Sequence, residues 1–205
     1  MEGESGDTVV RKVWSLPTRL FHWALAGTVL TGLYLGEFRS FTTIQLHFYF
    51  GYATGALIVF RLLWGLAGPP AARLSALFPS PRALVAYVRT LPRRRPSGMA
   101  GHNPLGALSV LAMLAALSVQ VVTGLCSEDD GLFSAGPLAS YLDPSTVLTM
   151  TALHHWSSRV VMALIVLHLG AVLFYRVWKR EDLVTAMITG RKAVRRDREG
   201  SGSGT

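Results

Sequence analysis

Only one cysteine, Cys126, occurs in this chain of 205 residues. A single cysteine excludes an intramolecular disulfide, a four-cysteine iron–sulfur cluster and a CxxCH motif for covalent attachment of c-type haem. Charged residues are also scarce, at 16% of the chain, which is low for a soluble domain. Metal chemistry in this chain therefore has to rest on its six histidines.

Hydrophobic residues make up 50% of the sequence, and the mean hydropathy of +0.36 is too high for an ordinary soluble domain. Four segments reach the roughly 20 largely apolar residues that a membrane-spanning helix needs. We expect an all-α integral membrane protein, a four-transmembrane-helix bundle that forms a single domain over residues 1–193. The expected helices cover about residues 20–38, 43–66, 104–126 and 149–178. The Gly/Ser-rich end, residues 194–205, is expected to be a disordered tail or an expression remnant.

The net charge of +8 is distributed unevenly along the chain. Three Lys and Arg precede the first expected helix, seven lie from Arg61 to Arg95, and eight lie from Arg176 onward. By the positive-inside rule, the N-terminus, the central loop and the C-terminus are cytoplasmic. The loops on the opposite side carry Glu37, Glu128, Asp129, Asp130 and Asp143 against one arginine, Arg39. The basic charge therefore indicates membrane topology and contact with lipid, and we expect no nucleic-acid binding.

The central loop contains the run PRALVAYVRTLPRRRP at residues 81–96. This pattern predicts a short amphipathic helix at the cytoplasmic interface, with its arginines near anionic headgroups.

Two histidines, His154 and His168, lie near the two ends of the last expected helix. Fourteen residues of α-helix place them roughly 21 Å apart and within about 40° of the same face. Because successive membrane helices alternate in direction, His47 lies at the level of His154 and His22 at the level of His168. Four histidines therefore form an outer pair and an inner pair.

Bis-histidine haem b suits each pair, because two neutral imidazoles from facing helices can ligate iron axially. The alternative for any single histidine is a hydrogen bond to a neighbouring helix. Zinc or a di-iron site fits less well, since the pairs are too far apart to share a site and the helices carry almost no carboxylates. His155 competes with His154, but thirteen residues to His168 rotate the two by about 140°.

Further candidates surround these pairs. Gly51 and Gly55 share the face of His47, so a flat macrocycle could lie there, although packing between helices explains such glycines equally well. Three arginines, Arg159 at the outer level and Arg19 and Arg61 at the inner level, could contact haem propionates or act as interface anchors. His102 has no partner histidine and is a candidate for a quinone or proton site, or for a solvent-facing position.

The sequence resembles the bacterial cytochrome b561 and nickel-iron hydrogenase b-type cytochrome family. The matching motifs are VWSLPTRLFHW, GYATG after His47, RLLWG, GHNPLG, LHHWSSRVVMALIVLH and LVTAMITGRK. The resemblance implies a four-helix protein of the bacterial inner membrane with two haems b, ligated by His22, His168, His47 and His154. Members of this family commonly pass electrons between quinone and a periplasmic partner. Hydrogenase-linked members often have an additional helix that is not found here, which favours a c-type cytochrome as partner.

We therefore expect transmembrane electron transfer between the quinone pool and a periplasmic redox protein. One alternative is a superoxide:quinone oxidoreductase, although acidic outer loops would repel an anion and attract a basic protein. Another is the membrane anchor cytochrome b subunit of a hydrogenase or other periplasmic dehydrogenase. A structural subunit without haem would leave the paired depths unexplained.

Overall fold

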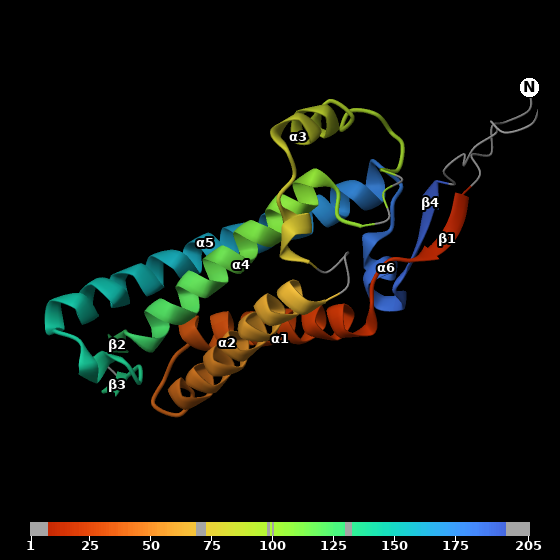
Figure 1. The fold of residues 1–205 in the computed structure, drawn as a ribbon. Helices are drawn as coiled ribbons and strands as arrows, with labels where there is room; N and C mark the ends of the chain where they lie inside the picture. Colours follow the sequence, from red (N-terminus) through yellow and green to blue (C-terminus); the bar gives the residue numbers. More distant parts are fainter. Residues whose placement is uncertain (1–7, 69–72, 98, 100, 130–132, 196–205) are drawn as a thin grey trace, which may run out of the picture.

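The computed structural model describes residues 8–68, 73–97, 99, 101–129 and 133–195 (Figure 1). Four long helices make up most of this part of the chain: α1 (Leu16–Glu37), α2 (Ile44–Ala67), α4 (Pro104–Leu125) and α5 (Pro144–Val177). Two short α-helices, α3 (Pro81–Val88) and α6 (Leu183–Thr189), lie near one end of the bundle. Two 3-10 turns complete the helical structure, Leu74–Leu77 and Ala139–Tyr141.

Polar caps and prolines set the starts of three long helices. The side chains of Ser15, Asn103 and Asp143 each accept a backbone N–H from the first turn, and a proline occupies that turn. As a result, α1 begins at Leu16 rather than near residue 20, and α5 begins at Pro144 rather than near residue 149. Hydropathy alone placed these starts too late, because the capping turns are polar.

The bundle packs as two neighbouring helix pairs, α1 with α2 and α4 with α5, with α2 also in contact with α4 (Figure 1). Its central cluster takes one buried residue from each long helix: Val29, Ile58, Leu117 and Val161. Apolar side chains also cover the outside of the helices, where Val166 is 70% exposed. An apolar exterior over an apolar core is typical of helices that face lipid.

Three helices in the described part of the chain, α2, α4 and α5, are long and apolar enough to cross a membrane. The helix α1 has 22 residues and packs along α2. Its role as a fourth span, and the cytoplasmic location of both termini, stay predictions.

The fold also contains two small antiparallel sheets that the all-α expectation did not include. The strand β1 (Thr8–Lys12) pairs with β4 (Arg191–Arg195), and β2 (Glu128–Asp129) pairs with β3 (Ser134–Ala135). The first sheet joins segments from opposite ends of the sequence and brings them to the end of the bundle that carries α6 (Figure 1). The expected tail at 194–205 thus begins inside β4, and residues 196–205 lie outside the described part.

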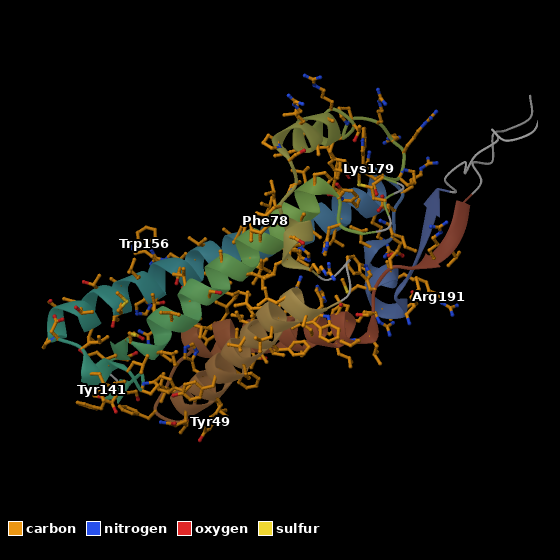
Figure 2. All side chains as sticks on the ribbon, viewed as in Figure 1. Tyr49, Phe78, Tyr141, Trp156, Lys179 and Arg191 are labelled. Carbon is orange, nitrogen blue, oxygen red and sulfur yellow. The ribbon has the colours of Figure 1, made fainter. Side chains whose placement is uncertain are left out.

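The helix α3 matches the short helix expected in the central loop, and buried polar contacts hold it against the end of α5. The hydroxyls of Tyr87 and Tyr175 lie 2.7 Å apart, and Asn103 donates to the Tyr175 hydroxyl at 3.1 Å. Lys179 lies at this end of the bundle (Figure 2) and is only 2% exposed as a residue. Its ammonium donates to the carbonyls of Thr90 and Arg93. Polar contacts therefore join α3 and the segment after it to the end of α5.

Candidate functional site

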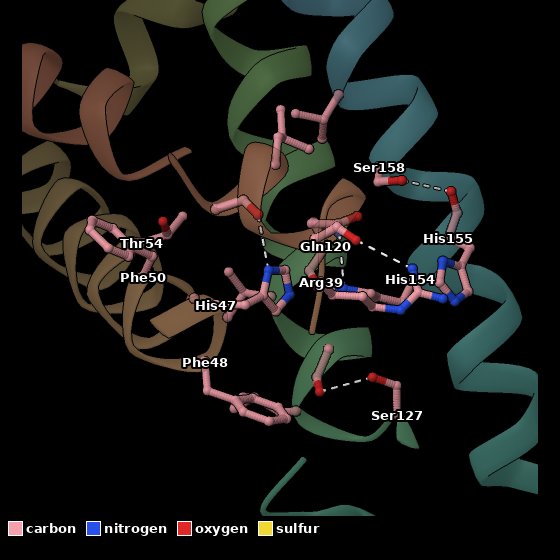
Figure 3. A pocket seen from close by; sticks show the side chains of 18 of the residues that line it. Arg39, His47, Phe48, Phe50, Thr54, Gln120, Ser127, His154, His155 and Ser158 are labelled. Atoms are coloured by element: carbon pink, nitrogen blue, oxygen red, sulfur yellow. Dashed lines mark hydrogen bonds between the residues drawn. The ribbon is translucent and has the colours of Figure 1, made fainter. Parts of the chain in front are cut away.

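The outer histidines, His47 on α2 and His154 on α5, face each other across the bundle (Figure 3). Their ring centroids lie 6.1 Å apart, and the ring planes cross at 86°. Both side chains line a cavity of about 190 Å³ to which α1, α2, α4 and α5 all contribute. The two residues that sequence order placed at one depth thus share one cavity.

Backbone carbonyls of the two other long helices fix the orientation of both rings. His47 Nδ1 lies 2.9 Å from the Gly32 carbonyl on α1, and His154 Nδ1 lies 3.0 Å from the Gln120 carbonyl on α4. Because a carbonyl can only accept a hydrogen bond, each Nδ1 carries the proton and each Nε2 keeps its lone pair. Histidines that ligate a metal through Nε2 usually donate from Nδ1 in this way.

Gln120 also contacts His154 through its side chain. Its amide nitrogen lies 3.2 Å from His154 Nε2, which agrees with an unprotonated Nε2, and its amide oxygen accepts from the Ser157 hydroxyl. Sequence reasoning missed Gln120, because nothing in the histidine spacing points to the helix opposite.

Charged residues lie at the outer end of this cavity. Arg39 Nε contacts Asp129 Oδ2 at 2.6 Å, joining the connection between α1 and α2 to β2. Glu37 and Glu128 line the same cavity, as do Asp129 and Arg39. Three acidic side chains and one arginine therefore line this cavity.

The inner histidines, His22 on α1 and His168 on α5, also face each other. Their ring centroids are 6.4 Å apart, with an interplanar angle of 47°. His22 Nδ1 is buried and has no hydrogen-bond partner within the described part of the chain. A buried polar nitrogen without a partner is costly, so the His22 ring carries a polar atom that no described residue satisfies.

Both separations match what a shared metal ion requires. A bond from a metal ion to a histidine nitrogen is about 2 Å long and half an imidazole adds about 1 Å, so two imidazoles on opposite sides of one ion have centroids about 6 Å apart. Among the described residues, no group of three or more His, Cys, Asp or Glu could hold a metal ion. The donor set thus fits a group that brings its own equatorial ligands, as haem does.

The two glycines next to His47 differ in their surroundings. Gly51 lines the outer cavity, and a Cβ there would meet nothing within 4 Å. At Gly55 a Cβ would lie 3.1 Å from Val121 on α4. The structure thus leaves room for a flat ligand beside Gly51, whereas Gly55 serves close packing between helices.

The three arginines lie in different surroundings. Arg159 stacks on Trp156 of its own helix at 5.0 Å, and Trp156 points away from the bundle and is 64% exposed (Figure 2). Arg19 donates to the Ile188 carbonyl at the end of α6, and Arg61 is buried at 7% exposure. Contacts of these arginines with propionates stay predictions, and for Arg159 the observed stacking favours the anchor role.

Two histidines remain outside the pairs. His155 lines the outer cavity, with its ring 6.3 Å from that of His154. His102 packs against Trp14 at 4.6 Å between ring centroids. Burial, together with the positive charges of Arg61 and Lys192, lowers the pKa of His102 to about 4. His102 is therefore a neutral, largely enclosed imidazole rather than a solvent-facing one.

Fold and site together define a helical membrane protein with two histidine pairs at two levels of its bundle. Residues 13–190 match the family model for prokaryotic cytochrome b561, and the chain belongs to that family. It is thus a membrane-integral protein of electron transport that uses b-type haem. It is also similar to a probable Ni/Fe-hydrogenase B-type cytochrome subunit of Rhizobium leguminosarum bv. viciae, with 23% identity over 217 residues that cover 91% of this chain and 90% of the relative.

Proposed function

We propose that the chain binds two haems b and carries electrons across the bacterial inner membrane between the quinone pool and a periplasmic redox partner. His47 and His154 hold the outer haem, and His22 and His168 hold the inner one. The observation that carries this proposal is the pair of centroid separations, 6.1 Å and 6.4 Å, at two levels of one bundle. The bound haems supply one-electron chemistry between ferrous and ferric iron.

Other residues of the protein orient the histidine rings that would bind iron, and the histidines in turn would keep substrates away from the iron. The carbonyls of Gly32 and Gln120 hold the outer rings in the Nδ1–H tautomer, which leaves Nε2 as the donor atom. Each haem would be held by two histidines, so a substrate would have no direct access to the iron, which favours electron transfer over chemistry at the metal. His154 and His168 lie on one helix, roughly 21 Å apart along its axis, so the two sites span much of a bilayer about 30 Å thick.

The topology proposed with this function has four membrane spans, α1 included, and cytoplasmic termini. It rests on the pairing of β1 with β4 at one end of the bundle and on the basic residues gathered there. The acidic outer cavity then faces the periplasm. We also propose His102 as a candidate quinone or proton site at the cytoplasmic end, next to Trp14 and near Arg61.

The outer charges favour a basic protein as partner, because Glu37 and Glu128 lie at the cavity while Arg39 is already paired with Asp129. A c-type cytochrome fits this chemistry. The name of the Rhizobium relative supports the alternative of a hydrogenase as partner. Superoxide is the second candidate substrate, and the same acidic residues would slow its approach.

Stopped-flow reduction of the purified protein by quinol, by a reduced basic c-type cytochrome and by superoxide separates these candidates. We expect reduction by quinol and rapid exchange with the cytochrome, faster at low than at high ionic strength. Reduction by superoxide alone, near the diffusion limit, would contradict the leading proposal and favour the superoxide oxidase.

A further inference from the structure

Two glycines on neighbouring helices pack directly against the outer histidine rings. A Cβ on Gly36 of α1 would lie 2.9 Å from His47 Cε1 and 3.2 Å from His47 Nδ1. A Cβ on Gly124 of α4 would lie 2.8 Å from His154 Cε1 and 3.1 Å from His154 Nδ1. At each glycine the three atoms nearest to an added Cβ all belong to the imidazole. The histidine ring is therefore the neighbour that a side chain at this position would meet first.

The same local pattern occurs at both places. The carbonyl that accepts from His47 Nδ1 belongs to Gly32, four residues before Gly36. The carbonyl that accepts from His154 Nδ1 belongs to Gln120, four residues before Gly124. Residues four apart lie one above the other on a helix, so each ring lies in a notch made by a carbonyl and, one turn later, a glycine.

We propose that Gly36 and Gly124 are positioning residues for the outer histidine pair. Each lets the Cε1–Nδ1 edge of an imidazole approach the neighbouring helix, which brings Nδ1 to the carbonyl and keeps Nε2 as the unprotonated ring nitrogen. A Cβ closer than about 3 Å to a ring atom forces the ring or the helix to move, because side chains occupy only a few staggered conformations. The role of these glycines toward haem rests on the proposed function, whereas the notch itself does not.

Packing between helices alone does not account for this pattern. At glycines that face a neighbouring helix without a histidine, the nearest atom is an apolar side-chain carbon: Val121 Cγ1 of α4 at 3.1 Å for Gly55, and Phe50 Cβ of α2 at 3.9 Å for Gly32. Gly27 on α1 and Gly170 on α5 are exposed, and a Cβ there would meet nothing within 4 Å. Neither His22 nor His168 is among the nearest atoms of any glycine described, so the notch is specific to the outer pair.

The test compares Gly36→Ala and Gly124→Ala with the matched controls Gly27→Ala and Gly170→Ala in the full-length, haem-loaded protein. Readouts are the haem content, the midpoint potential of each haem and the electron paramagnetic resonance signals of the two ferric low-spin haems, which depend on imidazole orientation. We expect either substitution in the notch to shift the outer-haem signal and potential, or to halve the haem content, with the inner-haem signal unchanged. The controls should match the wild type in all three readouts.

Wild-type signals and haem content in both notch variants would overturn the proposal, as would an equal change in the controls. A second measurement does not depend on haem binding or on the stability of a variant. In wild-type apoprotein labelled with nitrogen-15, nuclear magnetic resonance should show both outer histidines as Nδ1–H tautomers with slowly exchanging protons. An Nε2–H tautomer at either would overturn the notch. An Nδ1–H result in a protein that binds no outer haem would instead overturn the proposed function and leave the notch standing.

Discussion

His47 and His154, far apart in the chain, face each other from α2 and α5 with their ring centroids 6.1 Å apart. Each ring donates from Nδ1 to a carbonyl of a third or fourth helix, so all four long helices contribute to this one pair. Ligand position therefore depends on the packing of the whole bundle.

Loss of either outer histidine should remove one haem. We expect His47→Ala and His154→Ala to halve the haem content, because iron at this site would lose one of two axial ligands. His155→Ala is the matched control: this ring lies in the same cavity, but we expect it to leave the haem content unchanged. Haem extracted per mole of protein is the measurement. Loss of the outer haem in the His155 variant, with retention in the His154 variant, would show that the wrong neighbour was chosen.

Loss of an inner histidine should remove the other haem. His22→Ala and His168→Ala are expected to leave one haem, with the optical and resonance signals of the outer site. Combining His22→Ala with His47→Ala should remove both haems, because each site then retains one ligand. If the inner variants lost the same signal as the outer ones, the separation into two levels would be wrong.

Much of this pairing follows from the sequence. The order of the helices and their alternating direction place His47 with His154 and His22 with His168, and the helical repeat favours His154 over His155. These inferences need only the depth of each histidine in the membrane and its angle around the helix axis. Hydropathy gives the depth, and the helical rotation of about 100° per residue gives the angle.

The contacts that complete the site could not be derived in this way. The Gly32 and Gln120 carbonyls become partners only when α1 and α4 take their places, and no local pattern marks a carbonyl as an acceptor. Arg159 shows the same limit, because the direction of its helix allowed a reach toward a propionate, whereas the structure stacks it on Trp156. The pairing of β1 with β4 joins opposite ends of the chain, and so lies beyond any local signal. The four-residue spacing of Gly32 and Gly36 can be read from the sequence, but it does not indicate that the His47 ring packs against them.

The ion pair between Arg39 and Asp129 should control charge at the outer cavity. Its side chains are 41% and 25% exposed, so Arg39→Ala should lower the free energy of unfolding by no more than about 1 kcal/mol. The freed carboxylate makes the face more negative, so reduction by a basic c-type cytochrome should become faster at low ionic strength and any reaction with superoxide slower. Stopped-flow rates over a range of salt concentrations measure both effects. Arg89→Ala, on the segment after α3, removes the same charge elsewhere and should change neither rate.

Acidification should destabilise the protein through His102. Its pKa in the folded state is lowered from an ordinary 6.5 to about 4 by burial and by the charges of Arg61 and Lys192. Because the unfolded chain binds a proton at higher pH than the folded one, the stabilisation is complete above pH 6.5 and is lost as the pH falls toward 4. This loss is at most roughly 3 kcal/mol.

The measurement is thermal unfolding between pH 7.5 and 4.5 for the wild type and for His102→Asn, which cannot titrate. The variant should show a smaller decline in unfolding temperature over this range. An identical decline in both proteins would contradict the assignment, as would a His102 resonance that titrates near pH 6.5.

The most direct test of the whole account is the number of haems bound by the purified wild-type protein. Haem b extracted per mole of chain, together with the two low-spin ferric signals expected for bis-histidine sites, should give two per chain. One haem, or none, from protein purified from a haem-replete membrane would contradict the account.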